Sequence, residues 1–115
     1  MATATDCTVW AKATFGDADL GNQRRTARLV TLAGDLAAAD GGSTAKAHAD
    51  DEAAHEGAYR FLRNEHVVPE RIAEAGFRAS VERANSVENV LAIEDTSTLG
   101  YTHAVTVPCA RCAWR

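Results

Sequence analysis

The chain has 115 residues, 46% of them hydrophobic and 24% charged, which is typical of a single soluble globular domain. The formal net charge of −4 excludes a basic surface over the whole chain, so contact with nucleic acid would require a local cluster of basic residues. No apolar run approaches the roughly 20 residues that span a bilayer. The first residues lack the apolar core of a secretory signal, and we expect a cytosolic protein.

The most regular pattern in the first half predicts a long helix. After an unpatterned lead-in (1–9) and a short helical stretch (10–15), a Gly/Asp/Asn loop ends at Asn22, a good N-cap. Residues 23–39 then carry leucine and alanine at spacings of three and four, the pattern of a helix with one buried face. Three turn-forming residues end it, namely Asp40, Gly41 and Gly42.

A Ser/Thr loop separates this helix from a second one, predicted over residues 51–63. Gly57 lies inside the second helix at a propensity cost of about 1 kcal/mol, which indicates close packing against another element. The apolar side of this helix consists of Ala54, Ala58, Phe61 and Leu62.

A third helix is predicted from Pro69 to Ala84, since proline suits the first turn of a helix. Val67 and Val68, which precede it, are poor caps. Its apolar side consists of Ile72, Ala73, Ala75, Phe77 and Val81.

The pattern changes after Asn85. Residues 90–93, VLAI, are a short apolar run bounded by turn residues, which predicts a strand buried on both faces. Residues 101–107 are a candidate for a second, antiparallel strand. We therefore predict a mainly α fold of three or four helices, followed by the first strand or hairpin of a sheet.

Three basic residues, Arg24, Arg25 and Arg28, lie within the first turn and a half of the long helix. Arg24 and Arg28 share a face, whereas Arg25 is turned by about 100° toward the leucines. Arginine makes bidentate contacts to phosphate, and the free N–H groups of a helix N-terminus also attract anions. An ordinary solvated helix face is the alternative interpretation.

Tyr59 and Arg60, in GAYRFLRN (57–64), form a second candidate interface, and an amphipathic helix with exposed arginines is again the alternative. The histidines at 48, 55 and 66 share no ligand spacing on one face, and no role is assigned to them.

Asp95 lies just after the predicted strand. A carboxylate at a strand end can help to hold Mg²⁺ for phosphoryl transfer, which commonly uses two ions and several carboxylates. The alternative is an Asx-turn, in which Asp95 accepts hydrogen bonds from the backbone near Ser97.

The three cysteines are an odd number, which argues against a closed disulfide framework. Cys109 and Cys112 form a C-x-x-C pair, with His103 as a candidate third metal ligand. The remaining ligand of a zinc site would have to come from distant Cys7 or another histidine. A tail without a metal is the simpler interpretation.

Three stretches in order and register resemble the N-terminal part of bacterial cut-and-paste transposases of the transposon-five type: WAKATFGDADLGNQRRTARLVTLAGDLA, EAAHEGAYRFLRN and VLAIEDTSTLGYTH. The resemblance implies a helical domain over 1–84 that binds the double-stranded DNA of transposon ends. It further implies the start of a ribonuclease-H-like catalytic domain over 85–105, with a divergent tail over 106–115.

The motif R-R-T-A-R of that family matches Arg24, Arg25 and Arg28, and its Y-R matches Tyr59 and Arg60. The resemblance implies that these residues contact end-sequence DNA. The family also places a basic and an aromatic residue just after the long helix. This chain has alanine at both positions (38 and 39), so that set of DNA contacts is missing.

The E-D-T motif of the family matches residues 94–96 and makes Asp95 the first of three carboxylates that bind Mg²⁺ in the parent enzymes. The second Asp and the Glu lie beyond residue 115 in the family, and the tail after Val105 no longer resembles it, which suggests a frameshift or a decayed gene.

We therefore expect a truncated transposase in the bacterial cytoplasm that binds transposon-end DNA, holds no cofactor and cannot cleave DNA alone. Two alternatives remain. One is a helical module that pairs with a full-length transposase as an inhibitor, and the other is a gene remnant without function.

Overall fold

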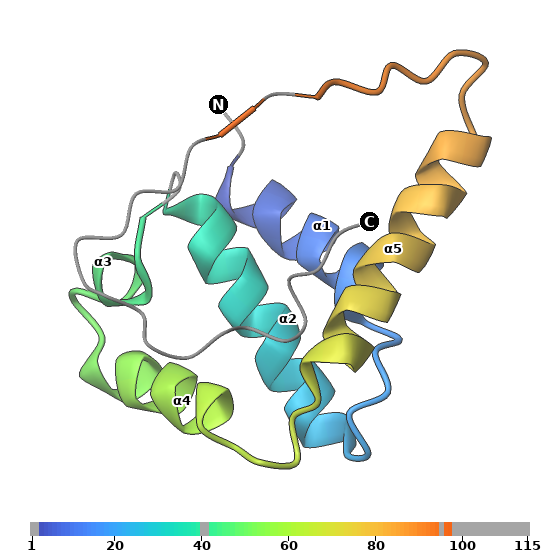
Figure 1. The fold of residues 1–115 in the computed structure, drawn as a ribbon. Helices are drawn as coiled ribbons and strands as arrows, with labels where there is room; N and C mark the ends of the chain where they lie inside the picture. The colour runs from blue at the N-terminus through green and yellow to red at the C-terminus, as the bar shows by residue number, and fades with distance from the viewer. Residues whose placement is uncertain (1–2, 40–41, 95, 98–115) are drawn as a thin grey trace.

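The computed structural model describes residues 3–39, 42–94 and 96–97. Within these residues the chain forms helices only, in the order α1 (Ala4–Phe15), α2 (Gln23–Ala38), α3 (Thr44–Ala47), α4 (Glu52–Leu62) and α5 (Pro69–Asn85). The mainly helical fold expected from the sequence is thus confirmed. Figure 1 shows α2 in the middle, with α3 and α4 toward one side and α5 toward the other. No helix in the described part of the chain is long and apolar enough to cross a membrane.

The lead-in expected over residues 1–9 is wrong, because α1 already begins at Ala4. A capping box starts this helix: the Asp6 N–H donates to the Thr3 hydroxyl at 3.2 Å, and the Thr3 N–H donates to the Asp6 carboxylate at 2.9 Å. This reciprocal pair satisfies two of the N–H groups that a helix start otherwise leaves free. The sequence signal was present as T-A-T-D over residues 3–6.

The long helix is confirmed as α2, with Asn22 as its N-cap. It packs against α1, α3 and α4, and α1 also contacts α5. The core lies where these helices meet, and partly buried Phe15, Leu36, Val67 and Ile72 pack around it. Its buried members are Ala18, Leu20, Leu29, Leu32, Ala58, Phe61 and Ala75. The core is small, and α2 is the element that connects its parts.

The predicted second and third helices are confirmed as α4 and α5, but their apolar sides are only partly right. Leu62 is exposed at the end of α4, and Phe77 on α5 is 72% exposed. On α5, Ala75 and Ala79 are buried, whereas Phe77 and Val81 lie on the opposite, exposed stripe. The helix carries two apolar stripes, and α1 covers one of them.

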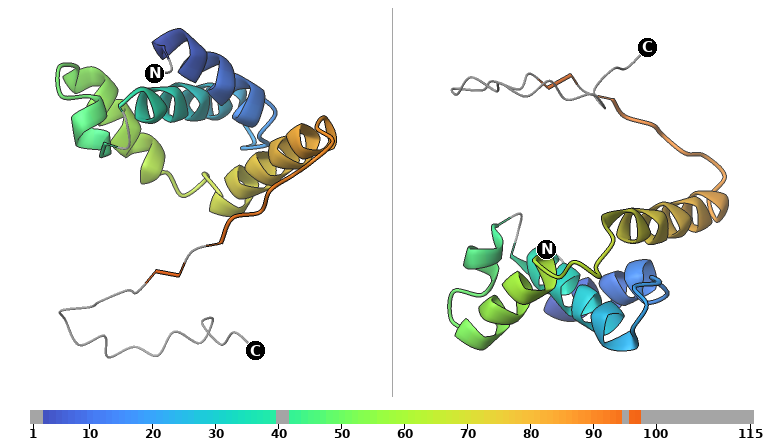
Figure 2. Two further views of the ribbon diagram at one scale, coloured as in Figure 1. Left: turned by 90° about the horizontal axis from the view of Figure 1, so that it is seen from above. Right: turned by 60° about the horizontal axis from the view of Figure 1, so that its bottom comes forward.

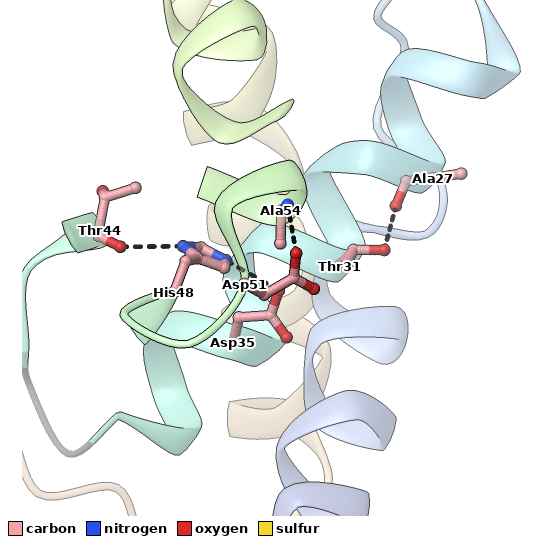
Figure 3. A network of polar contacts seen from close by, with 7 residues as sticks. All are labelled: Ala27, Thr31, Asp35, Thr44, His48, Asp51 and Ala54. Carbon is pink, nitrogen blue, oxygen red and sulfur yellow. Dashed lines mark hydrogen bonds and ion pairs between the residues drawn. The ribbon is translucent and has the colours of Figure 1, made fainter. Parts of the chain in front are cut away.

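The loop expected between the first two predicted helices contains the short helix α3, which is fastened to α2 by His48 (Figure 3). The buried His48 ring lies with Nδ1 2.9 Å from the Thr44 carbonyl oxygen and with Nε2 3.1 Å from Asp35 Oδ2. Asp51 then caps α4 by accepting a hydrogen bond from the Ala54 N–H at 2.9 Å. These contacts set where α4 begins beside α2.

The strand expected at 90–93 is not formed in the described residues after α5, which have no regular structure. The right-hand view of Figure 2 shows this segment leading away from the helices. Leu91 and Ile93 are both 82% exposed. A strand needs a partner for its backbone hydrogen bonds, and none of the described residues supplies one. The second strand expected at 101–107 lies outside the described residues.

Candidate nucleic-acid interface

The N-terminus of α2 forms one wall of the candidate interface. Asn22 Oδ1 accepts the hydrogen bond of the Arg24 N–H at 2.8 Å, which caps the helix. The first turn contains Arg24 and Arg25 and no acidic residue. Basic side chains at this position oppose the positive end of the helix dipole and reduce helix stability. The arrangement favours an external anion, which would be attracted by both the dipole and the arginines.

A groove of about 470 Å³ lies between α2 and α4, and we call it the arginine groove. It brings together arginines from the two candidate DNA-binding clusters of the sequence. Arg24, Arg25 and Arg28 line it from α2, and Arg60 lines it from α4. The same wall of α4 contributes a single carboxylate, Glu56. The remaining lining residues are Ala53, Gly57, Phe61 and Asn64. Four arginines face one acidic residue, so the groove is strongly basic in a chain whose net charge is −4.

The arginines of the groove differ in how they are held. Arg25 is partly buried, and its Nη1 donates to the Leu20 carbonyl oxygen at 2.9 Å. Arg60 Nε donates to Glu56 Oε1 at 2.9 Å, but this pair is solvent-exposed, and such pairs contribute little to stability. Arg60 can therefore release the Glu56 carboxylate and bind a phosphate instead at a low cost in free energy. The side chains of Arg24 and Arg28 form no hydrogen bond or ion pair within the described residues.

Arg28 nevertheless has a defined position against α4. A Cβ atom placed on Gly57 would lie 3.0 Å from Arg28 Cζ, which is closer than ordinary van der Waals contact. The close packing that Gly57 predicted in the sequence is therefore confirmed, and the group that packs there is a guanidinium. Sequence spacing gave no indication that the partner would be Arg28.

Tyr59 lies apart from the arginine groove, although it is adjacent to Arg60 in sequence. It lines a neighbouring pocket of about 830 Å³ with Glu52, Ala53, His55, Glu56 and Arg63. Its ring centroid is 4.9 Å from that of His55 and 5.5 Å from Arg63 Cζ. Consecutive residues of a helix point about 100° apart, which is why Tyr59 and Arg60 line different surfaces.

The candidate metal ligands cannot be placed in the same way. Asp95, His103, Cys109 and Cys112 lie outside the described residues. Among residues 3–39, 42–94 and 96–97, no group of three or more His, Cys, Asp or Glu side chains is arranged as a metal site.

A family model described as transposase DNA-binding matches residues 8–67. The match begins within α1 and ends just before α5, and it includes every residue that lines the arginine groove.

Proposed function

The chain belongs to the transposase DNA-binding family, and from this membership we propose that it binds transposon-end DNA through the groove between α2 and α4. The observation that carries the proposal is the convergence of Arg24, Arg25 and Arg28 with Arg60 on one groove. Phosphate contacts from such a cluster supply a large share of the affinity of a DNA-binding protein. We also propose, from the sequence resemblance, that the transposase is of the transposon-five type.

Within the groove we assign different tasks to the arginines. Arg24 and Arg28 are exposed and have no side-chain partner in the described part of the chain, so their guanidinium groups are free to bind phosphate oxygens. Arg60 joins them after releasing Glu56. Arg25 contributes charge while holding the loop before α2. Tyr59 is proposed to contact DNA only if the duplex extends beyond the groove onto the neighbouring pocket.

The test is a salt titration of DNA binding. Arg24→Ala, Arg28→Ala and Arg60→Ala should each weaken binding to a labelled duplex and reduce the slope of log K against log salt by about 0.9 for each phosphate that is no longer neutralised. Arg78→Ala is the matched control, because Arg78 is an exposed arginine on α5 outside the groove. If Arg78→Ala weakens binding as much as the groove variants do, the groove is not the interface.

We further propose that these 115 residues bind DNA without cutting it. The resemblance supplies a single carboxylate, Asp95, and two-metal phosphoryl transfer needs several. The prediction is that the purified chain does not nick supercoiled DNA with Mg²⁺. Nicking that disappears in Asp95→Ala would contradict it. Sequencing the DNA on both sides of the gene in every frame tests whether the remaining carboxylates were separated from this chain.

A second candidate function is pairing with a full-length transposase, which would make the chain an inhibitor. The observation that favours it is exposed apolar surface after the matched region, at Phe77, Val81, Leu91 and Ile93. Exposed apolar side chains of this kind often mark a protein interface. Co-purification with an intact transposase in the absence of DNA would support this function over DNA binding alone.

A further inference from the structure

We infer that Gly57 is a positioning residue for Arg28. Because glycine has no side chain, the Arg28 guanidinium can lie against α4 at position 57. The inference deepens the proposed DNA-binding function and rests on it. Gly57 lines the groove but has no side chain that could bind DNA, and the inference gives this glycine a role.

The geometry of the contact is specific. A Cβ on Gly57 would lie 3.0 Å from Cζ, 3.0 Å from Nη1 and 3.1 Å from Nη2 of Arg28. Near-equal distances to these three atoms put the Cβ position over the face of the guanidinium plane. A position beyond one edge would give clearly unequal distances. The flat face of Arg28 therefore packs on α4, which leaves the N–H groups along its edges for an external acceptor.

The backbone does not require glycine at position 57. Gly21 has a positive φ of 70°, whereas Gly57 lies inside regular α-helix, where alanine is strongly preferred. Alanine occupies the neighbouring positions 53, 54 and 58 of the same helix. What distinguishes position 57 is the guanidinium that faces it, and any larger residue would displace that group.

The contact with Gly57 positions the Arg28 guanidinium before DNA binds. Its side chain has no hydrogen bond or ion pair within the described residues, and the contact with Gly57 is the one that positions its guanidinium among them. A free arginine loses rotamer freedom when it binds, and holding it in place beforehand reduces that loss. Gly57 thus favours binding through preorganisation of Arg28, at the expense of helix stability.

The experiment substitutes Gly57 and, as a control, a second glycine that lies inside a helix, in the full chain. In Gly57→Ala, the added methyl group must push aside the flexible end of Arg28, which is easy for the fold. We expect the melting temperature to rise by about 4 °C, because alanine favours helix, while affinity for a labelled duplex falls about threefold to tenfold. A residue with a purely structural role would not move these two quantities in opposite directions.

Gly76→Ala is the matched control. Gly76 lies inside α5, where an added Cβ would meet Phe15 Cε1 at an ordinary 3.7 Å. This variant should gain similar thermal stability and keep wild-type affinity. A double-mutant cycle completes the design: in an Arg28→Ala background, Gly57→Ala should cause no further loss of affinity.

Wild-type affinity in Gly57→Ala, or an equal loss with and without Arg28, would overturn the inference and leave the proposed function intact. Insensitivity of binding to Arg24→Ala and Arg60→Ala would instead overturn the proposed function. If Gly57→Ala does not fold, Gly57→Ser and the relaxation of the Arg28 side-chain N–H in the free protein provide the same test. An Arg28 N–H that is equally mobile with and without the substitution would refute the positioning role.

Discussion

Arg25 donates a hydrogen bond from Nη1 to the carbonyl oxygen of Leu20 at 2.9 Å, so one arginine of the groove also secures the loop before α2. Leu20 is buried in the core, and Gly21 next to it takes a positive φ of 70°. The guanidinium therefore joins the basic groove to the folded core. Arg24, one residue earlier, has an exposed side chain and no such link.

This difference predicts that two neighbouring arginines respond differently to substitution. Arg25→Ala should lower the free energy of unfolding by about 1–2 kcal/mol, since a charge-assisted hydrogen bond is removed, and should also weaken DNA binding. Arg24→Ala should weaken binding with little change in stability. Urea denaturation of both variants measures this, and equal stability of the two would contradict the anchoring role of Arg25.

Reversing the charge at Arg24 should separate stability from binding. A carboxylate in the first turn of α2 complements the helix dipole, so Arg24→Glu is expected to raise the free energy of unfolding by about 0.3–1 kcal/mol. The same change should greatly reduce DNA affinity, because it places a negative charge in the basic groove. Arg24→Gln should fall between the two in both measurements. A loss of stability in Arg24→Glu would show that the interaction of residue 24 with the helix dipole is not the main effect of the substitution on stability.

The start of α1 should give the protein a pH-dependent contribution to stability. The Asp6 carboxylate accepts hydrogen bonds from the Thr3 hydroxyl, which has the larger effect, and from the Thr3 backbone N–H. Both lower the pKa of Asp6 below the usual 3.8. A lowered pKa stabilises the folded state above the unfolded-state value, and this contribution disappears as pH falls through the lowered pKa. The stability difference between wild type and Asp6→Asn should therefore shrink as the solution is acidified below about pH 4. A difference that stays constant down to about pH 2 would contradict this account.

His48 should matter for stability and not for binding. It is buried, it faces the Thr44 carbonyl oxygen and Asp35, and it lies outside the arginine groove. His48→Ala is expected to lower the free energy of unfolding by about 1–3 kcal/mol, because it removes the buried ring that contacts Asp35 and so holds α3 to α2. The affinity for DNA, measured well below the melting temperature, should stay near that of the wild type. Asp35→Ala, at a more exposed position, should cost less.

The segment after α5 should promote self-association. Leu91 and Ile93 are largely exposed and belong to no helix or strand in the described residues. Exposed apolar residues on an unpaired segment favour association between chains. Leu91→Lys together with Ile93→Lys should therefore reduce the average mass in analytical ultracentrifugation without lowering the melting temperature. A large fall in melting temperature would show that these residues pack within the fold.

The helices α2, α4 and α5 could be predicted from the sequence because their signals are local. Leucine and alanine periodicity defined α2, and the caps Asn22 and Asp51 work through hydrogen bonds to N–H groups two or three residues away. The same local logic, applied to Thr3 and Asp6, would have shown that α1 begins at Ala4. The roles of the arginines in DNA binding and of Asp95 in metal binding stay predictions.

Tertiary structure decided which of these local features meet. No spacing along the chain shows that the guanidinium of Arg28 lies on Gly57, or that Arg60 turns toward the groove while Tyr59 turns away. Likewise, the apolar pattern of α5 does not reveal that Ala75 is covered and Phe77 is not. Local patterns follow from hydrogen bonds between near neighbours in the chain. The basic groove depends on how α2 and α4 pack, which is determined by contacts between residues far apart in sequence.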